Sequence, residues 1–248
     1  ILNADELCSS MLKKDSYRVF YGIGKQPDDK TEPYNLIADY QICPNCGEKL
    51  KYNYLRYHHI GDVVCPKCGL HSPDKKYLAT DIDREKMTIT IQEGDKKTVY
   101  PLIHTALFNI YNEVTVISAL REIGLSAERV KELMGQIHIP DSRHNETTVN
   151  GVTVIQALSK GQSAVSSSRT FEYVANEEGK KAILLAMDDL EDRQKSIEFS
   201  GWIYDLEYEQ FNRDDVVQVI CTGPRCYDHK VRCLLAGIPE EKILTNLS

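Results

Sequence analysis

The amino-acid sequence predicts an α/β protein with more than one domain, and three observations support this prediction. At about 150 residues per domain, the 248 residues correspond to between one and two domains. In the second half of the chain, short apolar runs alternate with segments of helical periodicity. That alternation is typical of a parallel sheet covered by helices. Two Cys-x-x-Cys pairs in the first half indicate a small inserted module.

Composition and charge exclude several classes of protein. Hydrophobic residues make up 42% of the chain and charged residues 27%, which is ordinary for a globular protein and excludes disorder, collagen and coiled coil. The net charge of −7 disfavours general nucleic-acid binding. The apolar run at 182–187 is too short to span a bilayer. The chain starts with Ile and shows no secretory signal, so we expect a cytoplasmic protein whose sequence here begins inside a longer polypeptide.

The first half of the chain contains signals for strands and then for helices. A strand is expected at residues 17–21, and alternation around Gly94-Asp95 predicts a hairpin over 87–100. Helical periodicity starts after Asn112 and ends at Gly124. A second helix, capped by Ser126, is expected to run to Ile137, before Pro140.

A polar, turn-rich stretch at 139–151 is where we place a domain boundary, with domains at 1–140 and 141–248. Beyond it we expect a helix at 164–175, strands at 182–187 and 216–221, and a final helix that carries Val231 and Leu234. This order predicts a Rossmann-like parallel sheet. Ligands of such sheets bind at the carboxyl ends of the strands.

The strongest local signal is the spacing C-x2-C-x18-C-x2-C, within a module that we place at about residues 41–79. Each CPxCG turn directs two sulfur atoms at one centre, and four thiolates suit a tetrahedral ion. Zinc is the expected ion. A redox pair, an iron–sulfur site and disulfides are less favoured alternatives. The proposed ligands are Cys43, Cys46, Cys65 and Cys68.

Two further features of this ribbon allow other interpretations. Lys51 and Arg56 alternate with tyrosines, a pattern that could bind single-stranded nucleic acid, although a structural ribbon is favoured. His58, His59 and His71 could be metal ligands, but four cysteines already complete a structural site, so surface positions are expected for all three.

Several segments together resemble one family. They are ILNADE at 1–6, the twin CPxCG ribbon, FNIYNEVTVISALREIGLS at 108–126 and SGWIYDLEYEQF at 200–211. In this combination and order, the chain resembles the MurT family, the Mur-ligase-like subunits of lipid II isoglutaminyl synthase. The implied fold is the C-terminal part of a Mur ligase central ATPase domain with an inserted four-cysteine zinc ribbon, followed by a Rossmann-like α/β C-terminal domain.

The resemblance implies an ATP-dependent carbon–nitrogen ligase of peptidoglycan biosynthesis, and hence a role in cell-wall biogenesis and cell shape. Such an enzyme amidates the α-carboxyl of D-glutamate in the lipid II stem peptide and forms D-isoglutamine. The implied cofactors are ATP, Mg²⁺ and structural Zn²⁺. A GatD-type glutaminase would be the heterodimer partner and would supply ammonia from glutamine. Lipid II is membrane-anchored, and no nucleic-acid partner is expected.

The family's site residues map onto four positions of this sequence. The adenine-contacting N-x-x-N box falls on Asn109 and Asn112, although Asn112 could instead only cap the following helix. Asp205 matches a carboxylate at the glutaminase interface, with Glu207 as a weaker second candidate, although Asp205 could instead cap a helix at 207–211. Arg143 matches a linker arginine near the phosphates.

Two further observations and one alternative function bear on this interpretation. The sequence contains no G-x-x-x-x-G-K-[ST] loop, so we expect the 248-residue chain not to hydrolyse ATP alone. The carboxylates of Asp188, Asp189, Glu191 and Asp192 could bind Mg²⁺, but a solvated loop is favoured. The alternative function is that of a non-catalytic zinc-ribbon protein that binds nucleic acid or a protein partner.

Overall fold

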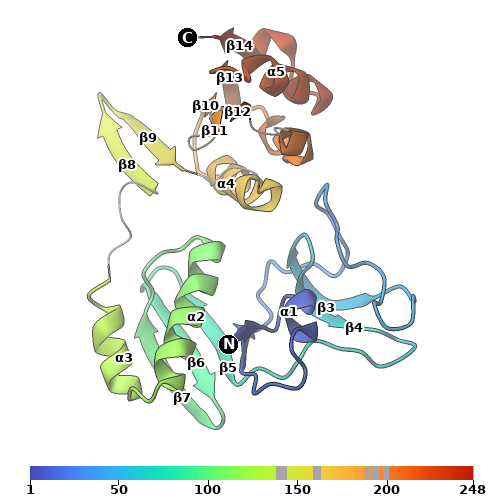
Figure 1. Cartoon of the computed structure of the whole chain (residues 1–248). Coiled ribbons are helices and arrows are strands. Elements are labelled where there is room, and N and C mark those ends of the chain that lie inside the picture. Colours follow the sequence, from blue (N-terminus) through green and yellow to red (C-terminus); the bar gives the residue numbers. More distant parts are fainter. Residues whose placement is uncertain (138–143, 159–162, 188–189, 192–195, 198–200, 248) are drawn as a thin grey trace. The chain divides into compact units, whose positions relative to one another are not determined.

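The computed structural model describes residues 1–137, 144–158, 163–187, 190–191, 196–197 and 201–247 (Figure 1). The chain forms two compact units, Ile1–Ile139 and Pro140–Ser248. Among the helices of the described residues, none is long and apolar enough to cross a membrane.

The first unit is built on a five-stranded sheet of order β1-β2-β5-β6-β7. Its strands are β1 (Leu2–Asn3), β2 (Phe20–Ile23), β5 (Tyr77–Asp83), β6 (Thr88–Glu93) and β7 (Lys96–Pro101). Strands β1, β2 and β5 are parallel, whereas β5, β6 and β7 are antiparallel. The predicted hairpin is confirmed, because Glu93 pairs with Lys96 across a turn in which Gly94 has a φ of 58°. The strand expected at 17–21 is displaced to β2.

Helices α2 (Leu107–Glu122) and α3 (Ala127–Met134) pack on this sheet and complete its core. Helix α2 begins before Asn112, where its start was predicted, because the buried stripe of Val114 and Ile117 extends back to Ile110. The Ser126 cap of α3 is confirmed, since the backbone N–H of Arg129 donates to Ser126 Oγ at 3.2 Å. Helix α3 ends at Met134 rather than at Ile137.

The cysteine module is inserted between two neighbouring strands of the sheet, β2 and β5. It contains an antiparallel pair, β3 (Lys51–Tyr57) and β4 (Ile60–Val64). The last residues of the predicted module, 77–79, already belong to β5 and pair with β2. The ribbon has a small core that includes Leu7 from helix α1 (Leu7–Met11) and Leu55 from β3. The N-terminal segment therefore packs against the ribbon.

The second unit contains a three-stranded parallel sheet of order β10-β13-β14, which confirms the predicted sheet type. The strands are β10 (Lys181–Ala186), β13 (Val216–Thr222) and β14 (Ile243–Asn246). The helices of the unit are α4 (Ala164–Asn176), α5 (Cys226–Leu235) and the 3-10 turns η1 (Gly201–Asp205), η2 (Tyr208–Phe211) and η3 (Glu240–Lys242). Helices α4 and α5 fall where the sequence predicted helices.

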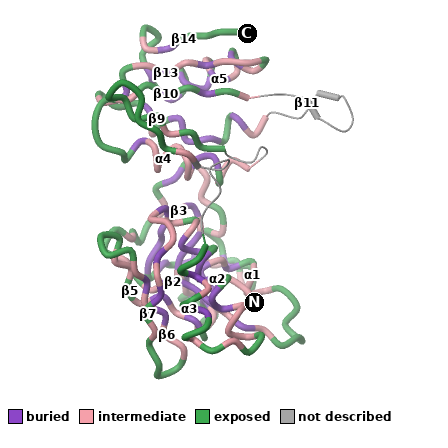
Figure 2. The backbone as a smooth tube through the Cα atoms, turned by 90° about the vertical axis from the view of Figure 1, so that its left-hand side faces the viewer, coloured by how far each residue is buried: buried purple, intermediate pink, exposed green. Residues whose placement is uncertain are grey.

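Two hairpins of the second unit were not predicted. One is the short pair β11 (Leu190–Glu191) and β12 (Ser196–Ile197). The other joins β8 (His144–Val149) and β9 (Val152–Ala157), so the stretch expected to be a linker at 139–151 contains a strand. Its turn is Asn150-Gly151, both with positive φ, which is the sequence signal of a two-residue hairpin. Figure 2 shows β9 as a largely exposed strand.

Candidate functional site

The four predicted cysteines come together, two from the segment before β3 and two from the segment after β4. Their sulfur atoms all lie within 4.8 Å of one another. The Sγ atoms of Cys43 and Cys68 are 3.6 Å apart, and those of Cys46 and Cys65 are 3.5 Å apart. A tetrahedral ion with Zn–S bonds of about 2.3 Å places its sulfurs about 3.8 Å apart. The four thiols therefore fit a single metal ion.

Both cysteine turns have the same backbone geometry, which explains why the sequence repeats CPxCG. Gly47 and Gly69 have φ angles of 73° and 74°, a conformation that favours glycine. Their N–H groups donate to the carbonyls of Cys43 and Cys65, at 2.9 and 3.1 Å. Each turn is thereby closed by its own backbone hydrogen bond.

Lys51 is exposed, but most of the basic and aromatic side chains that alternate along the ribbon are not on its surface. Tyr52, Tyr54 and Arg56 are all buried, with at most 9% of each residue exposed. Of the three histidines expected on the surface, His71 is exposed as predicted, whereas the other two differ from the prediction. His58 is buried with its Nδ1 2.9 Å from the carbonyl oxygen of Ile37, and His59 is only partly exposed. The burial of these side chains speaks against the nucleic-acid alternative.

Asn109 and Asn112 lie one turn apart in the first half of helix α2. At this spacing their side chains share one face of the helix. Asn112 is exposed and Asn109 partly exposed, opposite the buried stripe of Ile110 and Val114. The alternative role of Asn112 as a helix cap is wrong, because Asn112 is the sixth residue of α2 and the cap position is occupied by Ala106.

Directly after Asn112, helix α2 carries a buried carboxylate that the sequence did not identify. Only 4% of Glu113 is exposed, and burial raises its pKa to about 7. Its Oε2 accepts a hydrogen bond from the backbone N–H of Ile103 at 3.0 Å. Its Oε1 has no hydrogen-bond partner within the described structure. Glu113 thus anchors the loop that leads from β7 into the helix with the two asparagines.

Asp205 is the last residue of η1 and its side chain is exposed. The alternative that it caps the next turn is not supported, because the cap position of η2 is Glu207, which makes no side-chain capping bond. The weaker candidate Glu207 is buried. Of the two predicted acids, Asp205 is therefore the one whose side chain a partner molecule can reach.

A buried arginine of helix α5 fixes the backbone on both sides of Asp205. Arg232 Nε donates to the carbonyl of Tyr204 at 3.1 Å, and its Nη2 donates to the carbonyl of Leu206 at 2.7 Å. The same guanidinium pairs with the Glu209 carboxylate at 2.7 Å. The sequence reasoning did not identify Arg232, because its partners lie more than twenty positions away.

The structure does not describe the side chains of the remaining predicted site residues. Arg143 lies outside the described residues, as do Asp188, Asp189 and Asp192, and the side chain of Glu191 is not described either.

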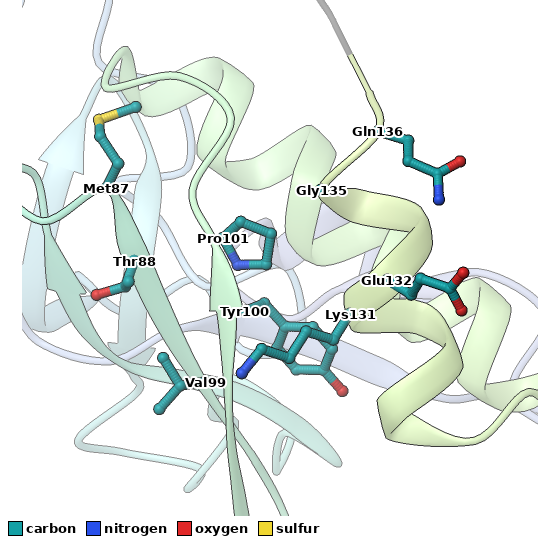
Figure 3. A pocket seen from close by; sticks show the side chains of 9 residues that line it. All are labelled: Met87, Thr88, Val99, Tyr100, Pro101, Lys131, Glu132, Gly135 and Gln136. Carbon is teal, nitrogen blue, oxygen red and sulfur yellow. The ribbon is translucent and has the colours of Figure 1, made fainter.

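A pocket of about 450 Å³ lies between the β6–β7 edge of the sheet and helix α3 (Figure 3). Met87, Val99 and Lys131 are among its lining residues, whereas Asn109 and Asn112 are not.

Sequence comparisons identify known proteins that are similar to this chain. Residues 161–248 match the family model described as MurT ligase C-terminal. The chain is 26% identical over 246 residues, 96% of its length, to the lipid II isoglutaminyl synthase (glutamine-hydrolyzing) subunit MurT of Staphylococcus aureus strain COL, of which it covers 52%. It is 24% identical over 207 residues, 82% of its length, to the Streptococcus pneumoniae subunit of the same name, of which it covers 44%. The chain thus spans about half the length of these curated relatives.

Structural comparisons show the fold. A pseudomurein peptide ligase type C from Methanothermus fervidus matches 99% of this chain and 45% of its own, with a TM-score of 0.69 and 17% identity. MurF from Acinetobacter baumannii matches 70% of this chain and 36% of its own, with a TM-score of 0.52 and 13% identity. The predicted fold class, Mur-ligase-like α/β with a four-cysteine insertion, is thereby confirmed. The chain is similar in sequence to the MurT subunits of lipid II isoglutaminyl synthase, and its C-terminal part matches their family model, as its motifs predicted.

Proposed function

We propose that this chain is part of the synthetase subunit of a glutamine-dependent amidotransferase. The enzyme would use ATP to amidate the α-carboxyl of D-glutamate in the lipid II stem peptide and form D-isoglutamine. The observation that carries the proposal is sequence similarity to MurT subunits along 96% of the chain. The outward-facing asparagines of α2 and the exposed Asp205 are consistent with it. We place this reaction in the cytoplasm.

The reaction requires activation of a carboxylate. A carboxylate is a poor electrophile, and its oxygen is a poor leaving group. Phosphorylation by ATP would convert it into an acyl phosphate, from which ammonia displaces phosphate. Bound Mg²⁺ would offset phosphate charge during the transfer. Asn109 and Asn112 are the residues proposed to hold the adenine, since a side-chain amide both donates and accepts hydrogen bonds. Arg143 is proposed to lie near the phosphates.

The four-cysteine centre is proposed to hold Zn²⁺ in a structural role. All four ligands come from the chain, which leaves no open position for substrate or water. The ion would therefore order the ribbon rather than take part in the chemistry.

Asp205 is proposed to act at the contact with a separate GatD-type glutaminase, which would supply the ammonia. A carboxylate can orient a histidine of a partner's Cys–His pair. The exposure of Asp205 and the fixed backbone on both sides of it support that role. We expect Asp205→Ala to reduce capture of such a glutaminase by the chain in a pull-down, with Asp214→Ala as an exposed acidic control in the same unit.

The adenine-binding role is tested by calorimetric titration of the full chain with ATP and with adenosine. Because each lost hydrogen bond to a bound base costs about 1 kcal/mol or more, Asn109→Ala should weaken binding roughly tenfold. Asn53→Ala is the matched control, since Asn53 is exposed on the ribbon. Equal affinity of the Asn109 variant and the unmodified chain, or no binding of either ligand by the unmodified chain, would remove the assignment of the asparagines.

A further inference from the structure

A buried cluster of charged and hydroxyl groups connects the ribbon to helix α2. Its centre is Asp5, which is fully buried. The Asp5 carboxylate accepts hydrogen bonds from Tyr54 Oη at 3.1 Å and from Tyr111 Oη at 2.7 Å. Arg56 Nη1 lies 2.8 Å from the same carboxylate and also donates to Tyr111 Oη at 2.6 Å. One carboxylate thus joins the N-terminal segment, ribbon strand β3 and helix α2.

The buried charges of this cluster balance, and one further carboxylate, that of the partly exposed Asp62, lies 3.2 Å from Lys75 at its edge. Asp5 and Asp29 are negative, and Arg56 and Lys75 are positive. No more than 9% of any of these four side chains is exposed. Lys75 Nζ lies 3.2 Å from Asp5, and Arg56 Nη2 lies 3.3 Å from Asp29. Removal of one partner from such a set leaves an uncompensated charge in the interior, which is far more costly than the loss of an exposed pair.

Strand β3 connects this cluster with the metal centre. Leu55 is fully buried in the ribbon core, together with Cys43 and Cys65. Its two neighbours in the strand, Tyr54 and Arg56, supply the ribbon's donors to Asp5. A small module with little core depends on its metal for order, so the position of β3, and with it that of Arg56, should depend on occupancy of the four cysteines.

At the other end, the cluster contacts α2 between the two asparagines. Tyr111 follows Asn109 by two positions and precedes Asn112 by one. Its hydroxyl accepts from Arg56 and donates to Asp5, so both hydrogen bonds hold the same turn of the helix. The backbone of the N-terminal segment is also bound to the ribbon, because the N–H of Gly61 donates to the carbonyl of Asp5 at 2.8 Å.

We propose that Arg56 and Asp5 are positioning residues for helix α2, and that metal binding at the four cysteines and the order of the turn with Asn109 and Asn112 are thermodynamically linked. The consequence for nucleotide binding rests on the proposed function. The linkage itself does not, because it concerns only the metal centre and the helix.

The test is hydrogen exchange of the full chain, loaded with Zn²⁺ or treated with a chelator. Loss of a hydrogen bond to a charged group costs about 1.5–3 kcal/mol, so chelation should raise exchange in the first half of α2 roughly tenfold or more. Exchange in β6 and β7 should rise much less. In Tyr111→Phe, which removes only the hydroxyl, exchange in α2 should be raised already with metal, and chelation should add little.

Tyr77→Phe is the matched control, because the Tyr77 hydroxyl contacts α2 at its other end, through Glu122 at 2.8 Å. This variant should keep the full response to chelation. Arg56→Lys serves as a second variant if Tyr111→Phe does not fold, and its response should be reduced. The proposal is overturned if chelation leaves α2 unchanged, if it raises exchange in β6 and β7 equally, or if Tyr111→Phe responds like the unmodified chain. Nucleotide titrations remain a separate readout, so failure of the proposed function would not be mistaken for failure of the linkage.

Discussion

Replacement of Glu113 by glutamine should remove the part of the pH dependence of the first unit's stability that this carboxyl contributes. Burial raises the pKa of Glu113 from 4.5 to about 7. Each pKa unit corresponds to about 1.4 kcal/mol, so ionisation of this carboxyl in the folded state costs about 3 kcal/mol. Because only 4% of the residue is exposed, solvent screening reduces this cost little.

The direction follows from the raised folded-state pKa. Below pH 4.5 the carboxyl is protonated in both the folded and unfolded states, and the fold has its full stability. As the pH rises from 4.5 to about 7, the unfolded chain ionises while the folded chain retains its proton, so the free energy of unfolding falls. Above about pH 7 the loss is complete. Glutamine is neutral throughout and keeps an acceptor oxygen for the Ile103 N–H, so its variant should not show this loss.

The assay is urea unfolding at pH 5 and at pH 8. Unfolding of the first unit is monitored by hydrogen exchange in α2. The chain's single tryptophan, Trp202, packs against the core of the second unit, so its fluorescence reports that unit separately. Between these two pH values, the unmodified chain should lose about 2 to 3 kcal/mol more than Glu113→Gln. Glu85→Gln, at an exposed position, should behave like the unmodified chain. If Glu113→Gln keeps the same slope with pH, the assignment of a buried, unpaired carboxyl is wrong.

Two further predictions concern α5 and α3. Burial lowers the pKa of His229 from 6.5 to about 4, so the second unit should be fully stable above pH 6.5 and lose up to about 3 kcal/mol as the pH falls to 4. Trp202 fluorescence during urea unfolding should show this loss, and His229→Gln should not; an equal loss in the variant would contradict the assignment. Ser126→Ala should lower stability by about 1 kcal/mol through loss of the α3 cap, measured by thermal unfolding, and no change would show that the cap is dispensable.

The elements that the sequence predicted well depend on local patterns. The β6–β7 hairpin follows from alternating apolar residues around Gly94-Asp95, and the parallel sheet of the second unit follows from short apolar strands separated by helices. The four cysteines come together because each CPxCG turn is a local structure with a glycine at positive φ. The sequence signal for the β8–β9 hairpin, its Asn150-Gly151 turn, is equally local, so this hairpin could have been predicted.

The features that the sequence did not predict depend on distant partners. Arg56 resembles a surface residue of a basic ribbon, and its contacts with distant residues, among them Asp5, 51 positions earlier, and Tyr111, 55 positions later, explain its burial. Glu113 resembles an exposed helix residue until the loop that carries Ile103 is placed over it. The start of α2 was predicted too late because Asn112 is a common capping residue, whereas tertiary packing of Ile110 extends the helix.

Helix α2 is held at two points that should respond to different conditions. Through Tyr111 it is tied to a cluster in which Asp5 and Asp29 are balanced by Arg56 and Lys75, so this contact should depend on order in the ribbon and hence on metal. Through Glu113 it is tied to the loop at Ile103, and this carboxylate forms no ion pair among the described residues, so that contact should depend on pH. Both contacts lie within one turn of Asn112. Metal removal and a rise in pH should therefore disturb the asparagine face through different contacts. Because Tyr111 and Glu113 are two positions apart on one helix, the two effects on exchange in α2 should be coupled rather than additive in free energy.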